Sequence, residues 1–136
     1  KAVLNANYVL SRLRSAFPPA YDHLCMHECV LTATPYHDYE VRALDFAKAL
    51  LDRGFHAPTV YFPLTVKEAL MIEPTETETK ETLDQFCNTM LELAELAKQN
   101  PEELRKAPIT TPVQRLDEVK AAKELNVVRP VNTSKV

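Results

Sequence analysis

The sequence has 136 residues, of which 46% are hydrophobic, and it carries 16 basic and 19 acidic side chains for a net charge of -3 at pH 7. This is enough apolar material for one domain with a core. The charges are mixed and form no basic stripe, which argues against a nucleic-acid partner. No apolar run approaches the roughly 18 residues of a membrane span. The single glycine excludes phosphate-binding and dinucleotide-binding loops, which need several.

Three cysteines without a spacing repeat favour a reducing compartment over a disulfide framework, so we expect a cytoplasmic protein. No signal-peptide pattern opens the chain. The chain begins at Lys1, without methionine and already inside a helical pattern. We therefore expect it to be a fragment of a longer protein.

The first predicted element is a helix over residues 2–16, which Pro18 and Pro19 prevent from continuing. Its apolar residues recur at helical spacing. They are Ala6, Val9, Leu10, Leu13 and Phe17.

The best predicted strand runs from Leu24 to Thr34, because apolar and polar residues alternate along it. The alternation places His23, Cys25, His27, Cys29 and Leu31 on one face. Four ligands in a row along one strand cannot converge tetrahedrally on a single ion. Cysteine is also a common buried residue. We therefore predict no metal site.

A loop is predicted from Thr34 to Tyr39, followed by a second helix from about Glu40 to Arg53. Gly54 then takes the left-handed position that ends a helix. Two short apolar runs bracketed by proline follow, at 59–64 and 69–73, and they predict an extended pair of segments.

The third and longest predicted helix begins at Thr75 or Thr77, either of which can cap it, and ends at Asn100-Pro101. Glu76 and Glu78 near its start are expected to form a solvated acidic turn. The predicted apolar stripe of this helix comprises Leu83, Phe86, Cys87, Met90, Ala94 and Ala97.

Beyond this helix we expect one more turn at 102–107, an extended stretch at 108–112 and a short helix at 117–125. The last eleven residues, 126–136, lack an apolar pattern and predict a surface or frayed tail. Residues 1–125 then form one small α/β (α+β) domain. Its strands interleave with helices, which predicts a small sheet covered by helices on one face.

Two long strings, Gly54-Phe-His-Ala-Pro-Thr59 and Leu70-Met-Ile-Glu-Pro-Thr-Glu-Thr-Glu78, closely resemble one family. They are similar to the C-terminal part of the pyridoxal-phosphate-dependent glycine decarboxylase, the P-protein of the glycine cleavage system, in its bacterial second-subunit form. The resemblance extends from Leu4 to Val119. It implies the small C-terminal domain of a fold-type-I pyridoxal-phosphate enzyme, with a short, mostly antiparallel sheet.

The resemblance also implies a function. The full protein would decarboxylate glycine, with pyridoxal phosphate as electron sink, and pass the aminomethyl group to the lipoyl arm of the carrier H-protein. Its partners would be the large cofactor domain, a second P-protein subunit and the H-protein. The family's cofactor lysine lies in the large domain, and no segment here matches it. None of Lys48, Lys67 or Lys80 therefore inherits that role, and the isolated chain is expected to be inactive.

The resembling strings supply the candidate site residues. His56 and Glu73 are the candidate catalytic residues, and Thr59 and Thr75 are candidate substrate or interface residues. A histidine held by Pro58 suits proton handling, and Glu73, at a strand end, is positioned to approach it. Each also has a plainer interpretation, as a loop residue or part of a helix start. The alternative function is a free-standing binding or regulatory module without chemistry.

In the matching family a glycine usually precedes Val41, where this chain has Glu40, and an aromatic residue usually stands where it has Cys29. The first difference leaves the conformation of the loop at 36–40 open. The second favours packing over metal binding at Cys29.

Overall fold

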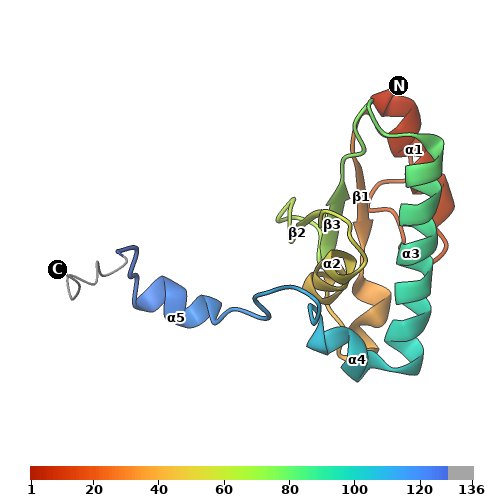
Figure 1. Cartoon of the computed structure of the whole chain (residues 1–136). Helices are drawn as coiled ribbons and strands as arrows, with labels where there is room; N and C mark the ends of the chain where they lie inside the picture. The colour runs from red at the N-terminus through yellow and green to blue at the C-terminus, as the bar shows by residue number, and fades with distance from the viewer. Residues whose placement is uncertain (129–136) are drawn as a thin grey trace.

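A computed structural model describes residues 1–128 of the chain (Figure 1). The elements in order are α1 (Ala2–Leu13), β1 (Cys29–Thr32), the 3-10 helix η1 (Thr34–Tyr39), α2 (Ala43–Asp52), β2 (Thr59–Val60), β3 (Ala69–Ile72), α3 (Lys80–Gln99), α4 (Pro101–Lys106) and α5 (Glu118–Lys123). Within these residues, no helix combines the length and the apolar character that a membrane crossing requires.

The sheet has three strands in the order β1-β3-β2, and both pairings are antiparallel. Leu31 on β1 and Val60 on β2 both pair with Leu70 on the central strand. Helices α1 and α3 lie side by side and pack on one side of the sheet (Figure 1). The small, antiparallel, helix-covered sheet predicted from the sequence is confirmed.

The two faces of the sheet differ in burial, as the alternation of side chains along a strand requires. The face toward the helices carries residues that are at most 6% exposed. They are Cys29, Leu31, Leu70 and Ile72. The opposite face carries the half-buried Val30 and Met71, with the exposed Thr59 paired to Met71.

The predicted stripes of α1 and α3 form much of the core. All five apolar residues of the first stripe are buried, and in the second stripe only Phe86 stays half-buried. Three aromatic rings pack together in the core. The Phe46 ring meets the Phe17 ring edge-on, with the centroids 5.0 Å apart, and the Tyr36 ring with the centroids 4.9 Å apart. Burial raises the pKa of Tyr36 to about 12, and its hydroxyl donates to the Ala16 carbonyl at 2.9 Å.

Polar groups also join α1 to α3. Arg12 donates to Asp84 and to Asn88, each at 2.7 Å, and Tyr8 contacts the same Asp84 carboxylate. Asn5 of α1 is 6% exposed, and its amide donates to the Thr75 carbonyl at 2.8 Å. Helix α1 is therefore held by hydrogen bonds both to α3 and to the loop that precedes α3.

The strand predicted from Leu24 to Thr34 is wrong in its first half, because β1 begins only at Cys29. Its partner β3 ends at Ile72, opposite Cys29, and Pro74 follows shortly. Proline has no N–H to continue a ladder. The backbone of Cys25 bonds instead to the Asn7 side chain, which accepts its N–H at 3.0 Å and donates to its carbonyl at 2.7 Å.

Two further boundaries differ from the prediction. The segment predicted as a loop is the 3-10 helix η1, and α2 begins at Ala43 instead of Glu40. Glu40 has a φ of 58°, a left-handed conformation that a helix start cannot contain. The resemblance implies a glycine at this position, and glycine adopts the left-handed conformation without strain. The helix starts once Arg42 is extended and its N–H donates to Asp45 at 2.8 Å.

The predicted helix end at Gly54 is confirmed. Gly54 has a φ of 79°, and Phe55 donates its N–H back to the Leu50 carbonyl at 3.0 Å. This closes the last turn of α2 and sends the chain toward the extended segment at 55–59.

We expect Gly54→Val to lower the free energy of unfolding by roughly 1 kcal/mol or more, because a β-branched residue is strained at positive φ. Nothing lies within 4 Å of a Cβ built at Gly54, so the cost comes from the backbone alone. Urea denaturation measures it. Gly54→Asn is the matched control, since asparagine tolerates the left-handed region. Equal losses for the two variants would contradict a backbone origin.

The predicted caps of the long helix, Thr75 and Thr77, are wrong. Thr79 is the N-cap, and its hydroxyl accepts the N–H of Thr82 at 3.2 Å. The helix ends at Gln99 before Asn100-Pro101, as predicted, and α4 provides the expected extra turn.

After α4, the chain leaves the domain through a segment that is held by hydrogen bonds to Asp52. The Asp52 carboxylate accepts hydrogen bonds from the Ile109 and Thr110 amides at 2.9 and 2.8 Å and from the Thr110 hydroxyl at 2.7 Å. Helix α5, predicted at 117–125, then extends away from the domain (Figure 1). The domain boundary at residue 125 stays a prediction, and most of the predicted tail, residues 129–136, lies outside the described part.

We expect the bonds at Asp52 to make this segment sensitive to acid. Burial opposes ionisation, but the hydrogen bonds from Thr110 and Ile109 outweigh it and lower the pKa of Asp52. A lowered carboxyl pKa contributes stability above the unfolded value of about 4, and this contribution is lost as the pH falls through the folded value. The Thr110 amide proton shift, followed by NMR, should titrate below the ordinary value and be flat in Asp52→Asn. A midpoint at or above that value would contradict the prediction.

Candidate functional site

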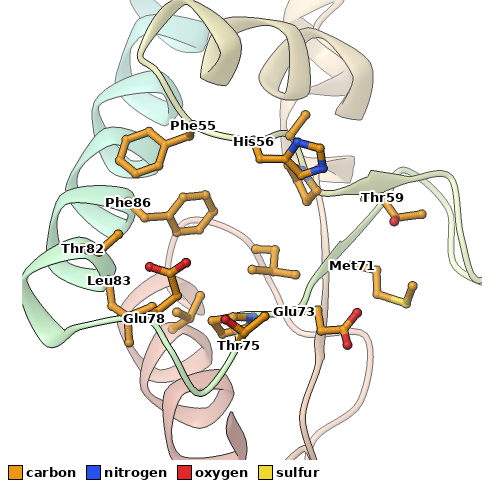
Figure 2. Close-up of a pocket in the computed structure, with 15 residues that line it drawn as sticks. Phe55, His56, Thr59, Met71, Glu73, Thr75, Glu78, Thr82, Leu83 and Phe86 are labelled. Carbon is orange, nitrogen blue, oxygen red and sulfur yellow. The ribbon is translucent and has the colours of Figure 1, made fainter.

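A pocket of about 390 Å³ lies where the segment 55–59, the end of β3 and the start of α3 meet (Figure 2). All four candidate residues from the sequence line it: His56, Thr59, Glu73 and Thr75. They come from three separate places in the fold, namely the segment after α2, strand β2 and the loop after β3. The structure thus brings together residues that are up to 19 positions apart in the sequence, counting from His56 to Thr75.

The inner wall of the pocket is apolar. Phe86 of α3 meets Phe55 edge-on, with the ring centroids 5.5 Å apart, and Leu83 and Ile72 lie beside them. Phe55 is in place because the end of α2 at Gly54 turns the chain back onto α3. The helix terminator therefore determines one wall of the pocket.

His56 follows Phe55, and its side chain is exposed. Within residues 1–128 its ring makes no hydrogen bond to the protein. Pro58 and the pairing of Thr59 with Met71 hold the chain after His56, and the hydrogen bond from the Phe55 N–H to the Leu50 carbonyl holds the chain before it. The imidazole is consequently presented to the pocket mouth and is available to a ligand or to another domain.

Glu73 does not pair with His56. The nearest basic partner of its carboxylate in the described residues is His27, with 3.8 Å between Nε2 and Oε1, and both side chains are more than half exposed. Figure 2 shows the Glu73 side chain on the opposite side of the pocket from His56. The described residues thus contain no ion pair between His56 and Glu73, and the approach of the two side chains stays a prediction for the complete protein.

Thr75 has a structural role as well as its place on the pocket. Its carbonyl accepts the Asn5 amide, and its hydroxyl lies 2.7 Å from that of Thr77. Thr59 is exposed at the pocket edge.

Glu78 is a pocket residue that sequence reasoning missed. It was expected in a solvated acidic turn, but it is half-buried and lines the pocket. Its carboxylate points toward the Phe86 ring (Figure 2). The sequence signal for this position was weak, because Glu76 and Glu78 carry the same residue type in the same turn.

The histidine and cysteine set at 23–29 does not lie along one strand, since β1 starts at Cys29. Burial raises the pKa of the Cys29 thiol to about 12, in keeping with a cysteine that packs as a small core residue. Residues 1–128 contain no cluster of three or more histidine, cysteine or acidic side chains arranged to hold a metal ion.

Pyridoxal phosphate, the cofactor implied by the resemblance, does not fit this pocket alone. The lining contains neither a lysine to bond the aldehyde nor an arginine to hold the phosphate. Its charged residues are the carboxylates of Glu73 and Glu78, which repel a phosphate. The chain thus supplies no complete cofactor site within the residues that the structure describes.

Comparison with known proteins agrees with the resemblance. Residues 1–115 match the family described as "Glycine dehydrogenase, C-terminal domain". The chain is 59% identical over 122 residues to the probable glycine dehydrogenase (decarboxylating) subunit 2 of Caldanaerobacter subterraneus subsp. tengcongensis, which covers 90% of this chain and 25% of that protein.

Proteins with the same description in Staphylococcus saprophyticus subsp. saprophyticus and Chloroherpeton thalassium are 54% identical over 123 residues and 55% identical over 126 residues. These alignments cover 90% and 93% of this chain, and 25% and 26% of the relatives. The chain therefore spans about a quarter of the length of these relatives. Because the match to the family covers most of the chain, this protein belongs to the glycine dehydrogenase C-terminal domain family.

Proposed function

We propose that this chain is the C-terminal domain of a pyridoxal-phosphate-dependent glycine dehydrogenase. The complete enzyme decarboxylates glycine and transfers the aminomethyl group to the lipoyl arm of the H-protein. The relatives are described as decarboxylating glycine dehydrogenases, and the chain aligns with them over nine-tenths of its length.

The single observation that carries this proposal beyond family membership is the shared pocket. Four residues chosen from the sequence line one cavity with an aromatic wall. A concave apolar site with a few polar groups is the usual form of a small-molecule site. The chain would thus close one side of the active site, and the large domain would supply the cofactor and its lysine.

In this proposal the residues of the chain have separate tasks. His56, exposed at the pocket mouth, holds or moves a proton next to the reacting group, since histidine exchanges protons near neutral pH. Glu73 orients a neighbouring group through its charge. Thr59 and Thr75 contact substrate or the facing domain, and the Phe55 and Phe86 rings exclude water from the inner wall.

The partners follow from the same proposal. They are the large cofactor domain, the other P-protein subunit implied by the name "subunit 2", the lipoylated H-protein and glycine. We also propose a cytoplasmic location, because all three cysteines are free thiols, as is usual in a reducing compartment.

A chimera tests the proposal. The C-terminal quarter of the Caldanaerobacter relative is replaced by this chain and assayed for glycine–bicarbonate exchange with the relative's partner subunit and H-protein. We expect the chimera to retain exchange within about tenfold of the parent enzyme, because 59% identity over 122 residues favours a shared fold for the exchanged part. The truncated relative and this chain alone should both be inactive. A folded, assembled but inactive chimera would instead favour the free-standing module.

A further inference from the structure

Apart from the imidazole of His56 at its mouth, the ionisable side chains on the pocket lining are carboxylates. The lining includes the carboxylates of Glu73 and Glu78 and contains no lysine or arginine. A half-enclosed site with this composition attracts cations and repels anions, because the apolar wall reduces the screening by water. The pocket therefore selects for positive charge.

The two carboxylates are not equivalent. Glu73 is exposed and lies 3.8 Å from His27. Glu78 is half-buried, and no basic side chain in residues 1–128 lies within 4.0 Å of its oxygens. It also directly precedes the N-cap Thr79 of α3, where the helix dipole favours negative charge. Of the two pocket carboxylates, Glu78 is thus the one without a basic partner in the described residues.

The surroundings of Glu78 define the rest of the ligand. Its carboxylate faces the Phe86 ring, with Leu83 and Phe55 also on this side of the pocket (Figure 2). An aromatic face attracts an ammonium group, and the apolar wall packs against methylene groups. A volume of about 390 Å³ exceeds what a single small ion needs.

We propose that this pocket binds a primary ammonium group at the end of an alkyl chain. Glu78 is the counter-ion, and the Phe86 ring contacts the ammonium and the first methylene groups. This inference rests on the proposed function, because it assigns a class of ligand to the pocket that would form one side of the active site. The proposal predicts that a free carboxylate or phosphate group does not bind in the inner part of this pocket.

The test uses the 136-residue chain and three probes of one length, n-pentylammonium, n-pentanol and n-pentanoate. Binding is followed by NMR through the signals of Phe86, Leu83 and Met71. We expect saturable shifts with pentylammonium, weaker ones with pentanol and none with pentanoate. Glu78→Gln should weaken pentylammonium binding at least about fivefold, because a hydrogen-bonded charge pair is lost, and leave pentanol binding unchanged.

Glu76→Gln is the matched control, since Glu76 is an exposed carboxylate in the same turn that does not line the pocket. It should leave all three affinities unchanged. Pentanoate binding as tight as pentylammonium binding, unchanged affinity in Glu78→Gln, or no saturable binding of pentylammonium would each overturn the proposal. The chimera assay is independent: an inactive chimera with intact ammonium binding refutes the function alone, and an active chimera without ammonium binding refutes this inference alone.

Discussion

Replacing His56 with alanine in the chimera should lower glycine–bicarbonate exchange by about 10²–10⁴-fold, the usual cost of a lost acid–base group. The side chain is exposed and bonds to no other described residue, so the thermal stability should not change. A large loss of activity without a loss of stability is the signature of a side chain that acts on the substrate. The assay is exchange of labelled bicarbonate, measured beside thermal unfolding.

His37→Ala is the matched control, because His37 is also exposed but lies on η1, away from the pocket lining. It should leave both measurements unchanged. Two outcomes would remove His56 from the site. Unchanged exchange would make it an ordinary loop residue, and a loss of stability with normal exchange would make it a packing residue.

Phe46→Ala should lower the free energy of unfolding by about 3–5 kcal/mol, the range for deleting a buried aromatic ring. Phe46 is 0% exposed and makes edge-on contacts with both Phe17 and Tyr36, so its removal leaves a cavity beside these two buried rings. A domain of this kind is stable by only about 5–15 kcal/mol in total. Phe46→Ala should therefore lose a large share of the total free energy of unfolding, and urea denaturation measures this loss.

Leu64→Ala is the control for Phe46→Ala, since Leu64 is 88% exposed. We expect its effect to stay within about 0.5 kcal/mol. Phe46→Leu should fall between the two, because leucine fills part of the cavity. A loss under about 1 kcal/mol in Phe46→Ala would show that the three rings do not form the packed end of the core.

The helices were predictable because their signal is local. The spacing of apolar residues in α1 and α3, and the single glycine after α2, determine these elements without reference to the rest of the chain. The length of β1 was not predictable in this way. It depends on where β3 runs out of pairing residues and on the Asn7 side chain, which bonds to the backbone of Cys25.

The pocket was predictable only in part, for a similar reason. The family strings identified four residues that line it, but their mutual distances depend on tertiary structure. Glu73 meets His27 instead of His56 because the irregular segment before β1 returns beside the end of β3. The choice of Thr79 over Thr75 and Thr77 as the helix cap likewise depends on backbone geometry, since all three residues have the same side chain.

The hydrogen bond from Asn5 to the Thr75 carbonyl has a mechanical consequence. It joins α1 to the loop that forms one rim of the pocket, while Arg12 ties the same helix to α3. A rigid helix held at both ends transmits a displacement without absorbing it. We therefore expect a movement of α1 to displace both the rim and α3, the helix against which Phe55 of the facing segment packs.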